Sequence, residues 1–267
     1  MFKVGFIGGG NMASAIIGGA LGSGFLTPES VAVSDVDAQV SADLAQKFGV
    51  AALGDNRVLA ARSWLIVLAV KPQFYPEVIE QIKEQALEGG QKIVMTLAPG
   101  WSLERTRQAF GAPIKVVRAM PNTPALVGQG TTGFCAGEDL TTAESQWVSS
   151  LLESFGKAQP LPERLMDTFV GLCGSSPAFV FMMIEALADA AVHEGFPRAQ
   201  AYALAAQAVL GSAQMVLELG QHPAQLKDMV CSPGGSTIEG VRVLEEKGMR
   251  SAFFEAALRT IAKSREL

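Results

Sequence analysis

The feature that most constrains this chain is a run of three glycines directly after its first apolar segment. Residues 3–7 form a short apolar run typical of a strand, and residues 11–21 have the amphipathic pattern of a helix. Strand, tight turn and helix in this order, with Gly8-x-Gly10-x-x-Ala13 at the turn, predict a dinucleotide-binding unit. Gly8 would make the turn, Gly10 would let a pyrophosphate approach the backbone, and Ala13 would keep helix and strand close. The helix N-terminus would hold the diphosphate. An ordinary tight turn is the alternative.

Length and composition narrow the class of protein. The 267 residues are enough for one large domain or two smaller ones, and 49% hydrophobic with 18% charged residues describes a well-buried protein. A net charge of -5 without a basic run argues against nucleic acid and against an anionic membrane surface. Three scattered cysteines (Cys135, Cys173 and Cys231) suit a reducing compartment. Continuous apolar runs are shorter than the roughly 20 residues of a membrane helix. We therefore expect a soluble, cytoplasmic protein.

An acidic residue follows the second predicted strand. Residues 31–34 are a short β-type run that ends at Asp35, about 20 residues beyond the glycine turn. An acid at this place can accept hydrogen bonds from the ribose hydroxyls of the adenosine half of the cofactor. Asp35 could also be the N-cap or a first-turn acid of the next helix, and both roles are compatible. It would repel a 2′-phosphate, and no Lys or Arg follows before Lys47. This pattern favours NADH over NADPH.

Strands and helices then alternate with short connections, which predicts an α/β fold with a doubly wound sheet. The expected strands are residues 50–53, 64–70, 92–97, 114–120 and 130–136, and the expected helices include 39–48, 78–87 and 142–155. The run 64–70 is apolar throughout, as in a parallel strand buried on both faces. It ends at Lys71-Pro72, at the sheet edge where such folds bind ligands. A solvated lysine explains Lys71 equally well.

The pattern changes near residue 161, after which prolines open helices and glycines close them. The expected helices are residues 176–194, 197–219, 223–230, 237–247 and 251 to the end. The first of them is apolar on nearly every face, so it needs cover on all sides. Either it packs deep against the first domain or two chains interleave their helices, and we expect the second arrangement, an obligate dimer. The domain prediction is a Rossmann-like dinucleotide-binding domain over residues 1–160 and an all-α dimerisation and substrate domain over residues 161–267.

A second loop that could bind a ligand interrupts the helical half at residues 231–237. It offers two glycines, the hydroxyls of Ser232, Ser236 and Thr237, and the N–H groups of a helix start, which together suit a carboxylate. An interhelical turn with Ser236 or Thr237 as N-cap is the alternative. The two histidines lack metal-ligand spacing, so no metal is expected, and nucleophile-elbow and Walker A patterns are absent.

Taken together, these stretches resemble the pyrroline-5-carboxylate reductase family over nearly the whole chain. The matching segments are residues 6–13, 69–72, 118–124, 173–179 and 225–237, of which the last is the most specific. The resemblance implies a Rossmann domain, a helical dimerisation domain, and NAD(P)H-dependent reduction of 1-pyrroline-5-carboxylate to L-proline, the last step of proline synthesis. It also implies dimers, which in several members assemble into rings.

The resemblance carries site roles to matching positions. It implies that the cofactor is bound by Ile7, Gly8, Gly9, Gly10, Asn11, Met12, Asn56, Ala69, Val70, Lys71, Pro72 and the end of the strand 92–97. Asp35 joins them on the residue pattern described above. The substrate loop comprises Ser232, Gly234, Gly235, Ser236 and Thr237. Ser232 and the N–H groups of Ser236 and Thr237 would hold the substrate carboxylate. The Thr237 hydroxyl would bond the ring nitrogen, which makes Thr237 the catalytic candidate.

Two positions depart from the family pattern. Phe179 stands where the family usually has tyrosine, and Asp35 stands where NADPH-preferring members carry hydroxyl or basic residues. The cofactor prediction is therefore NADH or NADPH. No Asp, Glu or His lies in the substrate loop, so we expect positioning and hydrogen bonding to supply most of the rate acceleration. The alternatives are a related imine reductase or small-acid dehydrogenase and, in another class, a non-catalytic nucleotide-sensing scaffold.

Overall fold

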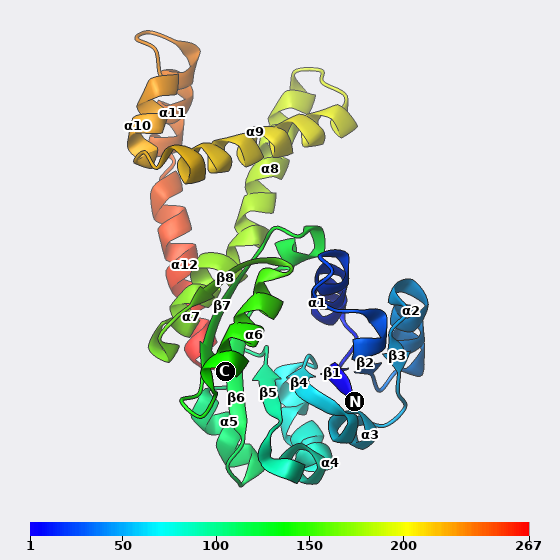
Figure 1. Cartoon of the computed structure of the whole chain (residues 1–267). Helices are drawn as coiled ribbons and strands as arrows, with labels where there is room; N and C mark the ends of the chain where they lie inside the picture. Colours follow the sequence, from blue (N-terminus) through cyan, green and yellow to red (C-terminus); the bar gives the residue numbers. More distant parts are fainter. Residues whose placement is uncertain (267) are drawn as a thin grey trace. The chain divides into compact units, whose positions relative to one another are not determined.

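The computed structural model describes residues 1–266, which divide into two compact units (Figure 1). The first unit comprises Met1–Ser175 together with the end of the chain from Thr260, and the second comprises Ser176–Arg259. The expected architecture, a Rossmann-like part followed by a helical part, is confirmed. The predicted domain boundary between residues 160 and 161 stays a prediction.

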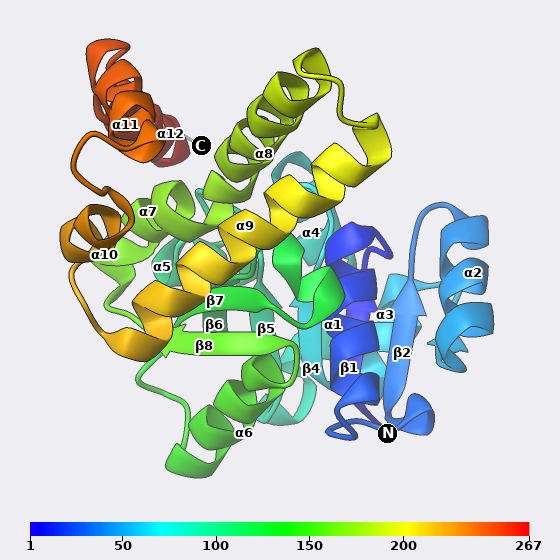
Figure 2. The same cartoon turned by 90° about the horizontal axis from the view of Figure 1, so that it is seen from above.

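A mixed sheet forms the centre of the first unit (Figure 2). Its strands are β1 (Phe2–Ile7), β2 (Val31–Ser34), β3 (Ala51–Ala52), β4 (Ser63–Leu68), β5 (Ile93–Thr96), β6 (Lys115–Met120), β7 (Gly130–Ala136) and β8 (Gly156–Pro160). Their order is β3-β2-β1-β4-β5-β6-β7-β8, and the described pairings are parallel except for β6 with β7. The order reverses between β1 and β4, which is where doubly wound sheets bind ligands. The predicted fold class is confirmed.

Helices cover both faces of this sheet and close two separate cores (Figure 2). The helices are α1 (Asn11–Gly22), α2 (Ala38–Phe48), α3 (Asn56–Arg62), α4 (Tyr75–Leu87), α5 (Leu103–Phe110) and α6 (Thr142–Glu153). In β4, Leu65 and Val67 join the core under α1, α2 and α6, whereas Ile66 and Leu68 join the core under α3, α4 and α5. This alternation in a continuous apolar run is what a strand buried on both faces requires.

The edge strand β8 was not expected from the sequence. Its residues, Gly-Lys-Ala-Gln-Pro, carry no apolar alternation, and it lies at the exposed edge of the sheet beside β7. A Cβ atom on Gly156 would lie 2.1 Å from the carbonyl oxygen of Gly130, so glycine is needed for the two backbones to approach. The predicted strand 50–53 is also shorter than expected, because only Ala51 and Ala52 pair with β2.

A short helical segment closes the first unit. The turn Glu163–Leu165 leads into α7 (Met166–Phe169), which continues as a π-helical turn over Val170–Gly174. Met166 and Phe169 pack with Met120 at the end of β6. This apolar cluster fixes the segment to the sheet.

The second unit is entirely helical over its described residues. It contains α8 (Ser176–His193), α9 (Arg198–Leu219), α10 (Pro223–Val230), α11 (Ser236–Glu246) and the greater part of α12 (Met249–Arg265). Helices α8 and α9 pack against each other, and α9 ends at Leu219, followed by the C-cap Gly220 with φ +62°. The helices predicted from proline and glycine positions are confirmed to within a few residues.

The length of one apolar helical stretch is not evident from continuous apolar runs in the sequence. Residues 163–193 are long and apolar enough to cross a membrane by length and composition, with mean hydropathy 1.6 over an 18-residue stretch of which 11% is buried. Glu185 and Asp189 interrupt its apolar residues and keep each continuous run short while the average stays high. Core helices of soluble proteins can have the same length and composition.

Candidate functional site

The turn after β1 has the geometry expected of a dinucleotide-binding loop. Gly8 has φ +101°, and its N–H donates to the carbonyl oxygen of Ser34 at 2.8 Å. A Cβ atom on Gly8 would lie 2.7 Å from the carbonyl carbon of Ala69 and 2.8 Å from the nitrogen of Val70. Glycine is thus required at this position both for its backbone angle and for the close approach of the loop after β4.

The start of α1 is open to an anion. Gly10 is the N-cap and no side chain caps the helix, so its first N–H groups are not satisfied by a side-chain acceptor. A Cβ atom on Gly10 would meet nothing within 4 Å, whereas one on Gly9 would lie 2.7 Å from Val40. Gly10 and Asn11 are exposed, and Ala13 is fully buried against the sheet. The arrangement fits a diphosphate at the helix N-terminus.

A cavity of about 930 Å³ gathers several of the predicted cofactor residues. Its lining includes Ile7, Gly8, Asp35, Asn56 and Val70, which come from the ends of β1, β2 and β4 and from the start of α3. Residues that sequence reasoning did not single out complete the wall, chiefly from α4: Phe74, Glu77, Val78, Glu80, Gln81, Glu84 and Gln85. The structure thus brings these five predicted residues together.

Two hydrogen bonds orient Asn56 in this cavity. The hydroxyl of Ser34 donates to Oδ1 of Asn56 at 2.7 Å, and Nδ2 of Asn56 donates to Oε1 of Gln81 at 3.0 Å. The side chain therefore connects the end of β2 to α4. The hydroxyl at the end of β2 is the sequence signal that could have identified Ser34.

The carboxylate of Asp35 is turned toward the glycine loop. Its Oδ2 accepts from the N–H of Gly9 at 2.7 Å, and its Oδ1 accepts from the N–H of Asp37 at 3.0 Å. The N-cap of α2 is Asp37, whose side chain accepts from the N–H of Gln39. The alternative that Asp35 caps this helix is therefore wrong, because the helix begins three residues later at Ala38.

Tyr75 braces the loops beyond β4 and β5, and sequence reasoning missed it. Its hydroxyl donates to the carbonyl oxygen of Leu68 at 2.6 Å and accepts from the N–H of Leu97 at 3.2 Å. Thr96 Oγ1 lies 3.3 Å from the same oxygen. Burial raises the pKa of Tyr75 to about 12, so the phenol stays protonated at neutral pH. A tyrosine just after the Lys71-Pro72 turn was the available signal.

The remaining predicted cofactor residues lie around the same loops. Ala69 donates its N–H to the carbonyl oxygen of Ile7 at 2.8 Å. Lys71 is exposed and is the N-cap of a single 3-10 turn, Pro72–Phe74. Met12 is partly buried and packs against the core on the α1 side of the sheet.

Asn122, in the rigid turn after β6, holds three segments of the first unit together. Its Nδ2 donates to the carbonyl oxygen of Cys173 at 2.9 Å, and its Oδ1 accepts from the N–H of Thr131 at 2.8 Å. The side chain is buried and both of its polar ends are satisfied. It thereby fixes the π-helical turn that precedes α8.

In the second unit, the predicted substrate loop lies between α10 and α11. Gly234 has φ +68°, and Gly235, which caps α11 without a side-chain hydrogen bond, donates its N–H to the carbonyl oxygen of Ser232 at 3.0 Å. A Cβ atom on Gly235 would lie 2.4 Å from the Ser232 hydroxyl, which therefore sits over the loop. Ser236 and Thr237 occupy the first two helical positions, so the alternative that either is the N-cap is wrong. Their N–H groups are among those that a helix start leaves for an anion.

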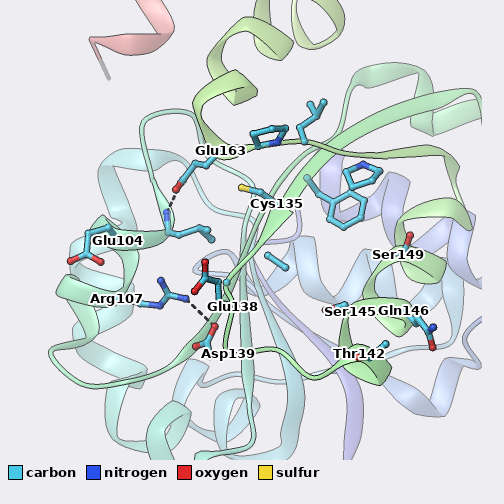
Figure 3. A pocket seen from close by; sticks show the side chains of 17 residues that line it. Glu104, Arg107, Cys135, Glu138, Asp139, Thr142, Ser145, Gln146, Ser149 and Glu163 are labelled. Carbon is cyan, nitrogen blue, oxygen red and sulfur yellow. Dashed lines mark hydrogen bonds and ion pairs between the residues drawn. The ribbon is translucent and has the colours of Figure 1, made fainter.

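A larger groove in the first unit contains none of the predicted site residues (Figure 3). Its volume is about 1120 Å³, and α5, β7, α6 and residues 160–163 line it. Arg107 and Asp139 form an ion pair at 2.9 Å, and Glu163 accepts from the N–H of Leu103 at 2.7 Å (Figure 3). Burial raises the pKa of the Cys135 thiol to about 12, which removes it as a nucleophile. Nothing in this groove assembles a reactive group.

Comparison with known proteins gives a family match for each half of the chain. Residues 163–267 match the family described as pyrroline-5-carboxylate reductase dimerisation, and residues 3–99 match NADP oxidoreductase coenzyme F420-dependent. The pyrroline-5-carboxylate reductase of Escherichia coli is 46% identical over 99% of this chain and 98% of its own length. That of Methanosarcina acetivorans is 43% identical over 99% and 97%.

Solved structures agree with these relatives. The pyrroline-5-carboxylate reductase of Coxiella burnetii is 34% identical with TM-score 0.89, covering 99% of this chain and 98% of that one. The Plasmodium falciparum pyrroline carboxylate reductase, solved with NADP bound, is 29% identical with TM-score 0.91, covering 99% and 97%.

Proposed function

The chain belongs to the pyrroline-5-carboxylate reductase family, and we propose that it reduces 1-pyrroline-5-carboxylate to L-proline with NADH or NADPH. The observation that supports the proposal most is that one chain contains both a loop suited to the cofactor and a loop suited to the substrate carboxylate. The Gly8–Gly10 turn has the geometry of a dinucleotide loop, and the Ser232–Thr237 loop has that of a carboxylate loop. A nucleotide sensor would not need the second loop.

The first unit fits a dinucleotide. The positive φ of Gly8, the uncapped start of α1 and the adjoining cavity provide a turn, anion donors and space for the adenosine half. Ile7, Asn11, Met12, Ala69, Lys71 and Pro72 lie on the same loops and are proposed cofactor contacts. When bound, the reduced nicotinamide supplies the hydride.

The second unit supplies the groups proposed to hold the substrate. The Ser232 hydroxyl and the N–H groups of Ser236 and Thr237 would bind the carboxylate, and Gly234 and Gly235 shape the loop around it. The C=N bond becomes CH–NH when two electrons and one hydrogen reach carbon as hydride and one proton reaches nitrogen. Thr237 would donate a hydrogen bond to that nitrogen and make the carbon more electrophilic. Because the loop contains no carboxylic acid or histidine, orientation carries most of the acceleration.

We further propose that the helical unit associates with a second copy, and that dimers assemble into a ring, as the family resemblance implies. The dimerisation family match over residues 163–267 and the apolar, poorly covered α8 support this. An acidic chain with three unpaired cysteines suits the cytoplasm and has no need of a nucleic-acid partner.

Replacing Thr237 by alanine tests the mechanism. We expect kcat to fall about 10- to 1000-fold, the range for a lost polar contact in a transition state, with cofactor affinity unchanged. Thr237→Ser, which keeps the hydroxyl, should retain most of the activity. A Thr237→Ala enzyme with unchanged turnover would remove this residue from the mechanism. Faster wild-type reduction of a 2-keto acid than of the cyclic imine would favour a small-acid dehydrogenase instead.

A further inference from the structure

We infer that this chain selects NADH over NADPH, and that the carboxylate of Asp35 makes the selection at the adenosine ribose. The inference rests on the proposed function for the identity of the cofactor site. The group that Asp35 would recognise is the ribose 2′-hydroxyl, in place of the 2′-phosphate of NADPH.

The hydrogen bonds of Asp35 leave room for two hydroxyl donors. A carboxylate offers about four lone pairs as acceptors. One on Oδ2 is used by the N–H of Gly9 at 2.7 Å, and one on Oδ1 is used by the N–H of Asp37 at 3.0 Å. Each oxygen therefore keeps further acceptor capacity, which is what the 2′- and 3′-hydroxyls of a ribose require. The two backbone bonds also hold the carboxylate in one orientation before the ligand arrives.

A 2′-phosphate beside Asp35 would meet a carboxylate of the same charge. A phosphate ester is negatively charged and mostly accepts hydrogen bonds, so it would confront the acceptor oxygens of Asp35. The two residues that follow, Val36 and Asp37, provide no cation either, and Val36 is fully exposed beside the cavity.

The charge of the cavity wall acts in the same direction. Five carboxylates line the cavity, those of Asp35, Asp55, Glu77, Glu80 and Glu84, against one guanidinium, that of Arg57. Arg57 is already bound by Asp55, to which its Nε and Nη2 donate at 3.1 and 2.8 Å. Glu80 is paired with Lys83, which lies outside the lining. A negatively charged wall disfavours the additional negative charge of the NADPH 2′-phosphate.

The test compares dissociation constants of NADH and NADPH on the full-length protein, by titrating the fluorescence of the reduced nicotinamide. We expect wild type to bind NADH at least about 10-fold more tightly than NADPH, the effect of a charged hydrogen bond gained by one ligand and a repulsion met by the other. Asp35→Asn keeps the acceptor for Gly9 but removes the charge, and should reduce this ratio about 10-fold. Asp37→Asn is the matched control, because it removes a charge outside the cavity and preserves a good N-cap, and it should leave the ratio unchanged.

Equal or tighter binding of NADPH by the wild-type protein would overturn the inference without any variant. So would a selective loss of NADPH binding in Arg57→Gln, because Arg57 would then be a phosphate ligand. The binding test needs no imine, so it is independent of the proposed reaction. Tight NADH binding without reduction of 1-pyrroline-5-carboxylate would reject the reaction and keep the inference, whereas efficient reduction with NADPH as the preferred donor would do the reverse.

Discussion

The two units of this chain bury their apolar residues to very different extents. In the first unit, the sheet strands and their helices form two closed cores in which residues such as Phe6, Leu65 and Ile79 are essentially inaccessible. In the second, over residues 176–259, the buried residues are Ala188, Ala201 and Leu226. Large apolar side chains there remain open, with Phe181 59% and Leu217 72% exposed.

This difference indicates where each unit obtains its stability. Exposed apolar surface on this scale marks an interaction surface in a protein that is not embedded in lipid. The first unit closes its own apolar cores, whereas the helical unit leaves large apolar side chains without cover of its own. The family match to a dimerisation domain supports a second copy as that cover.

The largest effect is expected from a charge placed on the apolar face of the helical unit. Phe181→Glu on α8 should weaken self-association by at least about 100-fold, because an unpaired carboxylate buried in an interface costs several kcal/mol. Val58→Glu on α3 is the control, since Val58 is also partly exposed but belongs to the first unit. Analytical ultracentrifugation measures both. An unchanged dimer in Phe181→Glu would show that this face of α8 is not covered by a partner.

A cavity in the core of the first unit should destabilise that unit alone. Leu65→Ala removes a fully buried side chain between β1 and β5 and should lower the free energy of unfolding by about 2–5 kcal/mol. The three tryptophans, Trp64, Trp101 and Trp147, lie in the first unit, so their fluorescence in urea reports that unit alone. Leu204→Ala, on an exposed position of α9, should leave this transition in place. Equal shifts in both variants would contradict the separation of the two units.

The smallest effect concerns Tyr75 and alkaline pH. Its folded-state pKa is raised from 10.0 to about 12, so the folded protein keeps a proton that the unfolded chain loses above pH 10. The stability contributed by Tyr75 is therefore complete below about pH 10 and declines by about 2–3 kcal/mol as pH approaches 12. Below pH 10, Tyr75→Phe should be less stable than wild type by about 1–3 kcal/mol because Leu68 and Leu97 lose their partner.

Unfolding in urea at several pH values measures the contribution of Tyr75 as the difference in free energy of unfolding between wild type and Tyr75→Phe. The difference should shrink as pH rises from about 10 to 12. Tyr202→Phe, an exposed tyrosine on α9, is the matched control and should show no such trend. A difference that stays constant with pH would mean that Tyr75 titrates normally in the folded protein.

Sequence periodicity was sufficient for most elements of both units. The continuous run 64–70 identified a central strand, and proline and glycine positions marked both ends of α9 and the start of α10. The strand β8 could not be predicted, because an edge strand of polar and small residues is formed by pairing with β7 and not by its own pattern.

The same limit applies to the candidate site. The glycine turn was recognisable from residue type and spacing, whereas the loop 231–237 was assigned to the substrate through the family resemblance, because an interhelical turn also explains its residues. The bond from Gly9 to Asp35 and the bracing by Tyr75 depend on contacts between residues 26 and 22 positions apart, which no local pattern reports. For Asp35, the sequence left a helix cap as an alternative, and only the position of Asp37 removed it.

The most direct test of the proposed function is the stoichiometry of the reaction catalysed by the purified full-length protein. With 1-pyrroline-5-carboxylate and a reduced nicotinamide cofactor, the account predicts one L-proline formed for each cofactor oxidised, and no cofactor oxidation when the imine is left out. Cofactor oxidation without proline, or no oxidation with this imine, would contradict it.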